Sequence, residues 1–202
     1  MALTEHGLSL GRLSLSPGFL LAGAVLVWKG VDPVLRACLT AAALHELGHL
    51  TVCCLLCVPV ARLRLSLLGA ELDTVGRCRS GGEEALVAFG GPAVNLVSVP
   101  LLLEVGEELL AGASLLLGLF NLLPMAPLDG NRLLHGLLSW RGSLETADRV
   151  TLAVSRWGHW LLLLPGAALA ALGNPSLLLL AVWMTAGERT EGPEAQTKCG
   201  WF

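Results

Sequence analysis

The chain has 202 residues, of which 54% are hydrophobic and only 14% are charged, and its formal net charge is −3. A soluble domain usually has about 25% charged residues, so this composition argues against a soluble globular protein. We also expect no nucleic-acid partner.

Six apolar runs rich in Leu, Ala and Val follow one another along the chain, at 18–28, 34–58, 85–103, 109–125, 157–172 and 175–186. A helix needs about 20 apolar residues to cross the hydrocarbon, although about 17 suffice. We therefore predict an all-α polytopic membrane protein with about six transmembrane helices. Its membrane-embedded domain spans 1–187, and 188–202 form a short polar tail. The first and last runs are short for a full span, so the helix count stays open at both ends.

The basic residues predict the orientation of this topology. If all six runs cross, every Lys and Arg except Lys29 and Arg36 falls on the same side. The cytoplasmic side of a membrane protein carries the excess of basic residues. We therefore expect a multi-pass membrane protein with both termini in the cytoplasm.

A different pattern fills the segment between the second and third runs. From Val60 to Thr74, hydrophobic and polar residues alternate, which indicates a half-buried strand. We predict a small β-hairpin here, whose free edge could bind an extended substrate by backbone hydrogen bonds. The residues expected to bind substrate are Leu63, Leu65 and Leu67. A purely structural hairpin that caps the helices is the alternative.

The second run contains the sequence HELGH, from His45 to His49. Residues four apart on a helix lie on the same face, so both imidazoles can bind one Zn²⁺. Glu46 points elsewhere and suits the role of general base towards a water molecule. Ionisable residues at membrane depth cost about 2.5–3.5 kcal/mol each, so three within five residues indicate a bound metal, most simply zinc.

A third protein ligand is expected from NLLPMAPLDG, at 121–130. Asp129 follows two prolines that interrupt the fourth run, at a depth similar to that of HELGH. Irregular backbone at this depth is tolerated where it lines protein or a wet cavity. Two histidines and one aspartate leave a coordination position open, which is typical of catalytic zinc. The alternative for Asp129 is a simple turn at the end of a helix.

Together, HELGH, FGGPAVN (Phe89–Asn95) and the N-x-x-P-x-x-P-L-D-G segment resemble the site-2 protease family of intramembrane zinc metalloproteases. The chain is most similar to the six-helix bacterial branch that includes the sporulation stage IV FB protease, here without the C-terminal nucleotide-sensing domain. The resemblance implies a zinc metalloendopeptidase of the bacterial cell membrane that cuts membrane proteins within the lipid bilayer. It is also compatible with a regulatory membrane partner.

The resemblance also assigns roles to individual residues. It implies that zinc is bound by His45, His49 and Asp129 and that Glu46 is catalytic. Asn121 would position substrate or stabilise the oxyanion, and Asn95 would support the metal-binding helix. Two other functions stay open: a metal-binding membrane protein such as a zinc transporter or sensor, and an inactive family member that acts as a scaffold.

Overall fold

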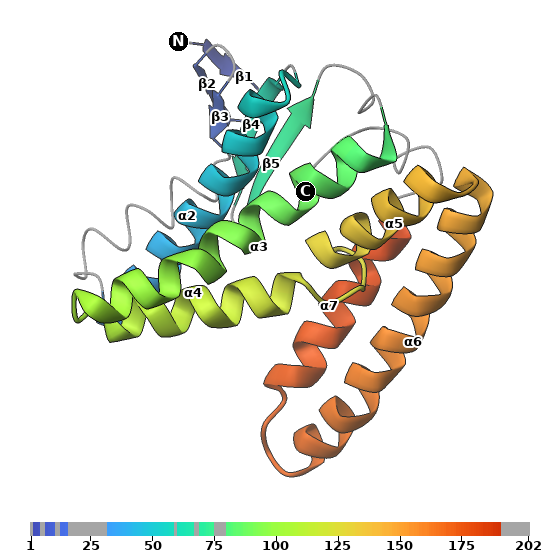
Figure 1. Ribbon diagram of the computed structural model, residues 1–202. Coiled ribbons are helices and arrows are strands. Elements are labelled where there is room, and N and C mark those ends of the chain that lie inside the picture. The colour runs from blue at the N-terminus through green and yellow to red at the C-terminus, as the bar shows by residue number, and fades with distance from the viewer. Residues whose placement is uncertain are drawn as a thin grey trace.

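The computed structural model describes residues 2–4, 7–10, 13–15, 32–58, 60–66, 69–74 and 80–190 (Figure 1). Its helices are α2 (Pro33–Leu55), α3 (Gly81–Glu104), α4 (Glu108–Asn121), α5 (Asp129–Arg141), α6 (Leu144–Ala171) and α7 (Ser176–Thr190). Its strands are β1 (Ala2–Thr4), β2 (Gly7–Leu10), β3 (Leu13–Leu15), β4 (Val60–Ser66) and β5 (Gly69–Thr74). The first predicted run, 18–28, and most of the predicted tail lie outside the described residues.

The helices form two groups joined by α5. Helix α2 packs against α3 and α4, and α6 forms an antiparallel hairpin with α7 that projects away from them (Figure 1). Helix α5 contacts α3 on one side and α6 on the other. The position of α5 therefore depends on both groups.

The strands form one sheet in the order β1-β2-β3-β4-β5. Strand β4 is antiparallel to β5, with Leu63 opposite Leu72, and parallel to β3, with Leu13 opposite Leu63. Both edges of β4 are thus paired, and our expectation of a free edge on this strand is wrong, because β3 occupies it. The free edges of the described sheet belong to β1 and β5. Leu67 lies outside the described residues.

Large aliphatic side chains lie mostly on the outside of the helices, and small or polar residues lie inside. Val97 is 67% exposed and Leu116 is 70% exposed, whereas Ala41, Ala88 and Asn95 are completely buried. Only α2 and α3, among the described helices, are both long and apolar enough to cross a membrane, by length and composition. The predicted count of about six spans therefore stays a prediction.

The segment between the fourth and fifth runs is helical. It holds α5 and the first half of α6, which begins at Leu144 rather than near Trp157. Ser143 caps α6 by accepting a hydrogen bond from the Thr146 N–H, and Arg149 pairs with Glu145 on its exposed face. Hydropathy missed these helices because charged and polar residues interrupt their apolar positions.

Glycines allow the helices that form the site to approach closely. At the crossing of α2 and α3, a Cβ on Gly48 would lie 2.9 Å from the Gly91 Cα and closer still to the Gly90 carbonyl. At the crossing of α3 and α5, a Cβ on Gly136 would lie 2.6 Å from the Gly81 carbonyl oxygen. Small residues are the usual means by which helix backbones meet in membranes. These two crossings bring both α2 and α5 close to α3.

Candidate metal centre and active site

The two histidines of HELGH lie one turn apart on the buried face of α2. His45 is 6% exposed and His49 is 2% exposed. Their rings meet edge to face, with centroids 4.7 Å apart. Their Nε2 atoms lie 3.1 Å apart and therefore point towards a common position.

Asp129, the first residue of α5, reaches the same position from the other side. Its Oδ2 atom lies 2.8 Å from His45 Nε2 and 3.3 Å from His49 Nε2. Gly130 permits this approach, because a Cβ there would collide with the carbonyl of Leu122. The structure thus brings together the three residues that the sequence predicts as metal ligands.

The spacing of these three atoms suits a tetrahedral cation. Donor atoms bound at about 2.0–2.1 Å with tetrahedral angles lie about 3.3 Å from one another. The three observed separations, 2.8, 3.1 and 3.3 Å, form a triangle of nearly this size. Two imidazoles and one carboxylate are also a donor set that zinc prefers. The geometry and the chemistry of the site therefore both fit Zn²⁺.

A backbone carbonyl orients His49. His49 Nδ1 donates a hydrogen bond to the Val87 carbonyl oxygen of α3, at 2.8 Å. A neutral imidazole with its proton on Nδ1 has a lone pair on Nε2, which is the form that binds metal. The sequence analysis missed this partner, since a backbone carbonyl leaves no signal in the sequence.

The side chain of Asn95 is placed to orient His45 in a similar way. Its side-chain nitrogen is 3.3 Å from His45 Nδ1, and its oxygen, completely buried, has no hydrogen-bond partner among the described residues. Rotating the amide by 180° about its Cβ–Cγ bond exchanges these two atoms. Asn95 Oδ1 would then accept from His45 Nδ1–H and lose its unpaired state. That arrangement also presents the His45 Nε2 lone pair to a metal.

Gly91 of α3 forms the wall of the site. A Cβ at this position would lie 2.7 Å from His45 Nε2 and closer to His49 Nε2. The space beside the two ligand atoms therefore exists only because residue 91 has no side chain.

The two predicted catalytic residues differ in their relation to the cluster. Glu46 is half-buried on α2 and interacts electrostatically with His49, His45 and Asp129. Asn121 ends α4, and its side-chain amide donates to the Leu117 carbonyl one turn earlier, at 3.1 Å. No hydrogen bond joins Asn121 to the cluster within the described part of the chain.

The chain is similar to several known proteins. Residues 107–165 match the profile of "Peptidase family M50", a range that includes Asp129 but not the two histidines. The chain is 36% identical over 136 residues to "Putative zinc metalloprotease Rip3" of Mycobacterium tuberculosis, covering 58% of this chain and 34% of that protein. It is 29% identical over 155 residues to "Putative zinc metalloprotease sll0528" of Synechocystis, covering 70% and 40%. These matches support assignment of the chain to the site-2 protease family.

A solved structure shows the same fold. The site-2 protease from Methanocaldococcus jannaschii superimposes with a TM-score of 0.67 at 22% identity, covering 91% of this chain and 93% of that one. The chain spans between a third and two fifths of the length of the curated relatives that it matches.

Proposed function

We propose that this chain is an intramembrane zinc metalloendopeptidase of the site-2 protease family that cleaves transmembrane or membrane-associated proteins. The convergence of His45, His49 and Asp129 on one position carries the proposal. The pattern of exposed aliphatic and buried polar side chains supports a location in the lipid bilayer, since a soluble protein rarely exposes so much contiguous apolar surface.

Each residue of the site has a task in this mechanism. When bound, zinc polarises the scissile carbonyl and lowers the pKa of a water molecule to about 7. The Glu46 carboxylate accepts a proton from the attacking water and later delivers it to the leaving amide nitrogen. Val87 and Asn95 hold the two imidazoles in the tautomer that binds metal. Asn121 is proposed to hydrogen-bond the substrate, for which its amide must leave the Leu117 carbonyl.

The substrate segment must be extended when it is cut, because a helix encloses its carbonyls in internal hydrogen bonds. We proposed Leu63, Leu65 and Leu67 as its binding residues on the basis of the sequence. Since β3 and β5 pair with both edges of β4, backbone addition to β4 requires β3 to leave. Otherwise, these leucines can contact substrate only through their side chains.

The test is Glu46→Gln, with Glu104→Gln as its control. Glu104 is an exposed carboxylate at the end of α3. Each full-length variant is expressed in cells that lack the wild-type protein, bound zinc is measured by mass spectrometry, and membrane-protein cleavage is followed through new terminal peptides. Glu46→Gln should retain zinc and slow cleavage about 10²–10⁴-fold, the usual contribution of a general base. Glu104→Gln should match the wild type.

Two other outcomes separate the alternatives. Unchanged cleavage by Glu46→Gln with its metal retained contradicts the protease assignment. If the wild type and Glu46→Gln both bind zinc and neither cleaves a membrane protein, the result favours the sensor or the scaffold. A transporter is disfavoured because Asp129 is the only buried carboxylate among the described residues, which leaves no series of charged groups along a path.

A further inference from the structure

The loop that precedes Asp129 is held by side chains of α6. Ala126 lies in this loop, three residues before the proposed ligand. Its N–H donates to Ser155 Oγ at 2.9 Å, and its carbonyl oxygen accepts from His159 Nε2 at 2.8 Å. Ser155 is 1% exposed and His159 is 3% exposed. One turn of α6 therefore satisfies both polar backbone groups of one loop residue.

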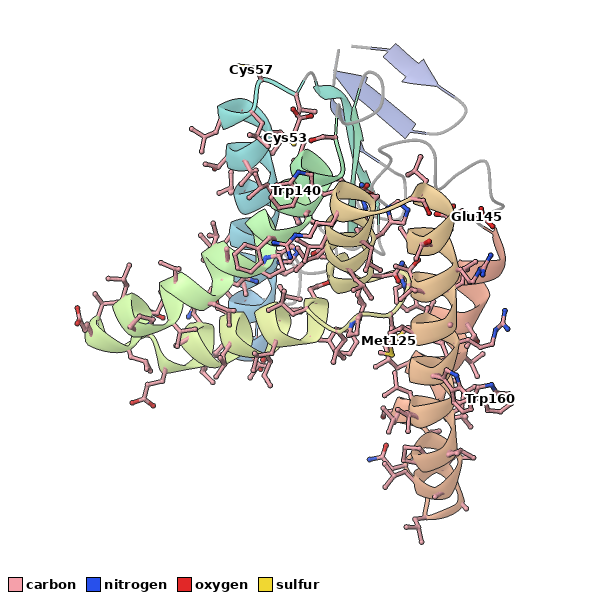
Figure 2. All side chains as sticks on the ribbon, turned by 45° about the vertical axis from the view of Figure 1, so that its right-hand side comes forward. Cys53, Cys57, Met125, Trp140, Glu145 and Trp160 are labelled. Carbon is pink, nitrogen blue, oxygen red and sulfur yellow. The ribbon has the colours of Figure 1, made fainter. Side chains whose placement is uncertain are left out.

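Apolar contacts reinforce this attachment. Met125, 5% exposed, packs with Leu128 and with the completely buried Met184 of α7. Figure 2 shows Met125 beside α6, where Gly158 leaves room for it, since a Cβ on Gly158 would collide with the Met125 sulfur. The loop is therefore held at adjacent residues by polar and apolar contacts with the same helical hairpin.

The connection from the attachment to the ligand is short and internally bonded. Leu128 N–H donates to the Met125 carbonyl at 2.8 Å, and Asn131 N–H donates to the Leu128 carbonyl at 3.1 Å. These bonds leave Asp129 little freedom relative to Ala126. The histidine ligands, in contrast, are oriented by groups of α3, the Val87 carbonyl and the Asn95 side chain.

We propose that Ser155 and His159 are positioning residues that set the place of Asp129 in the metal centre. Both act through the backbone of Ala126. This inference rests on the metal binding in the proposed function and adds the residues that determine its third ligand. It predicts that removing either hydrogen bond weakens metal binding by loosening Asp129 alone.

The experiment measures Co²⁺ affinity and the ligand-field spectrum of the full-length protein in detergent. Ser155→Ala and His159→Phe each remove one hydrogen bond from Ala126. Each should weaken Co²⁺ binding about tenfold, because loss of a hydrogen bond that helps to orient a metal ligand usually lowers metal affinity 10–100-fold. Each should also reduce the intensity of the absorption bands typical of tetrahedral Co²⁺. Ser155→Thr and His159→Gln retain the hydrogen-bonding groups and should restore both properties.

Thr151→Val is the matched control. Thr151 is buried on α6, one turn before Ser155, but its hydroxyl donates only to carbonyls of its own helix, those of Ala147 and Asp148. Its loss should leave Co²⁺ affinity and spectrum unchanged. Unfolding temperatures of the metal-free proteins show whether the variants are equally stable.

An Asp129→Ala background tests the route of the effect. If Ser155 acts through Asp129, Ser155→Ala should no longer change the weaker Co²⁺ affinity that remains there, since coupled residues are non-additive. Wild-type affinity in Ser155→Ala and His159→Phe overturns the proposal, as does an equal effect in the Asp129→Ala background. If Ser155→Ala and His159→Phe do not fold, the conservative variants decide. Weakened Co²⁺ binding by folded Ser155→Thr and His159→Gln proteins then overturns the proposal. Failure of the wild type to bind metal contradicts the proposed function instead.

Discussion

Gly91 provides the sharpest test of the metal centre, because one methyl group should abolish it. In Gly91→Ala, the new Cβ would lie 2.7 Å from His45 Nε2, whereas ordinary van der Waals contact begins at 3.4 Å. The imidazole must therefore retreat by about 0.7 Å, and His49 by more. Zinc sites tolerate deviations of about ±0.2 Å in their ligand distances. We expect zinc affinity to fall by at least about 100-fold.

The assay compares bound zinc and Co²⁺ affinity in Gly91→Ala and Gly112→Ala. Gly112 lies in α4, and a Cβ there would meet nothing within 4 Å. Both changes raise helix propensity, by about 1 kcal/mol, so this effect is common to the two variants. Gly112→Ala should bind metal as the wild type does. A folded Gly91→Ala protein with wild-type zinc affinity would refute the proposed position of the metal.

Two further predictions concern groups around the site. Asn95→Ala should lower metal affinity about tenfold, because His45 would no longer be held in the tautomer that binds metal. Asn95→Asp still accepts a hydrogen bond from His45 Nδ1 and should lose less affinity. Equal losses in a Co²⁺ titration would contradict this role of Asn95. His135 contacts Glu84 at 3.2 Å and Asp148 at 2.9 Å, and the hydrogen bond to Glu84 chiefly raises the pKa of His135 above 6.5. The contribution of these contacts to the free energy of unfolding is therefore complete below pH 6.5 and is lost as pH rises through the raised pKa. His135→Gln should flatten this decline in the free energy of unfolding, measured by urea unfolding across pH 6–9.

The sequence was most informative where the spacing of residues along a helix determines their geometry. The four-residue spacing of His45 and His49 fixes their relative position on any helix, so their shared face could be predicted without other information. The approach of Asp129 followed from its depth in the expected topology, and the structure places it beside both rings. The ligand roles themselves stay a prediction until metal binding is measured.

The features that the sequence did not reveal depend on tertiary contacts. The β3–β4 pairing joins segments about fifty residues apart in sequence, and no local pattern specifies it. Helix α5 is polar on one face and short, so a search for apolar runs passed over it. The polar pair Ser155 and His159, one turn apart in an apolar helix, is a visible signal, but its partner is a backbone group that only the folded chain supplies.

The long separation between His45 and Asp129 has a consequence for assembly. The two side chains meet across 84 residues of sequence, so a cation held by both acts as a reversible staple between distant parts of the chain. Such a staple stabilises only the folded form, and resistance to heat should therefore increase with the concentration of free metal. During synthesis, capture of the ion must wait until α5 has been made and has docked.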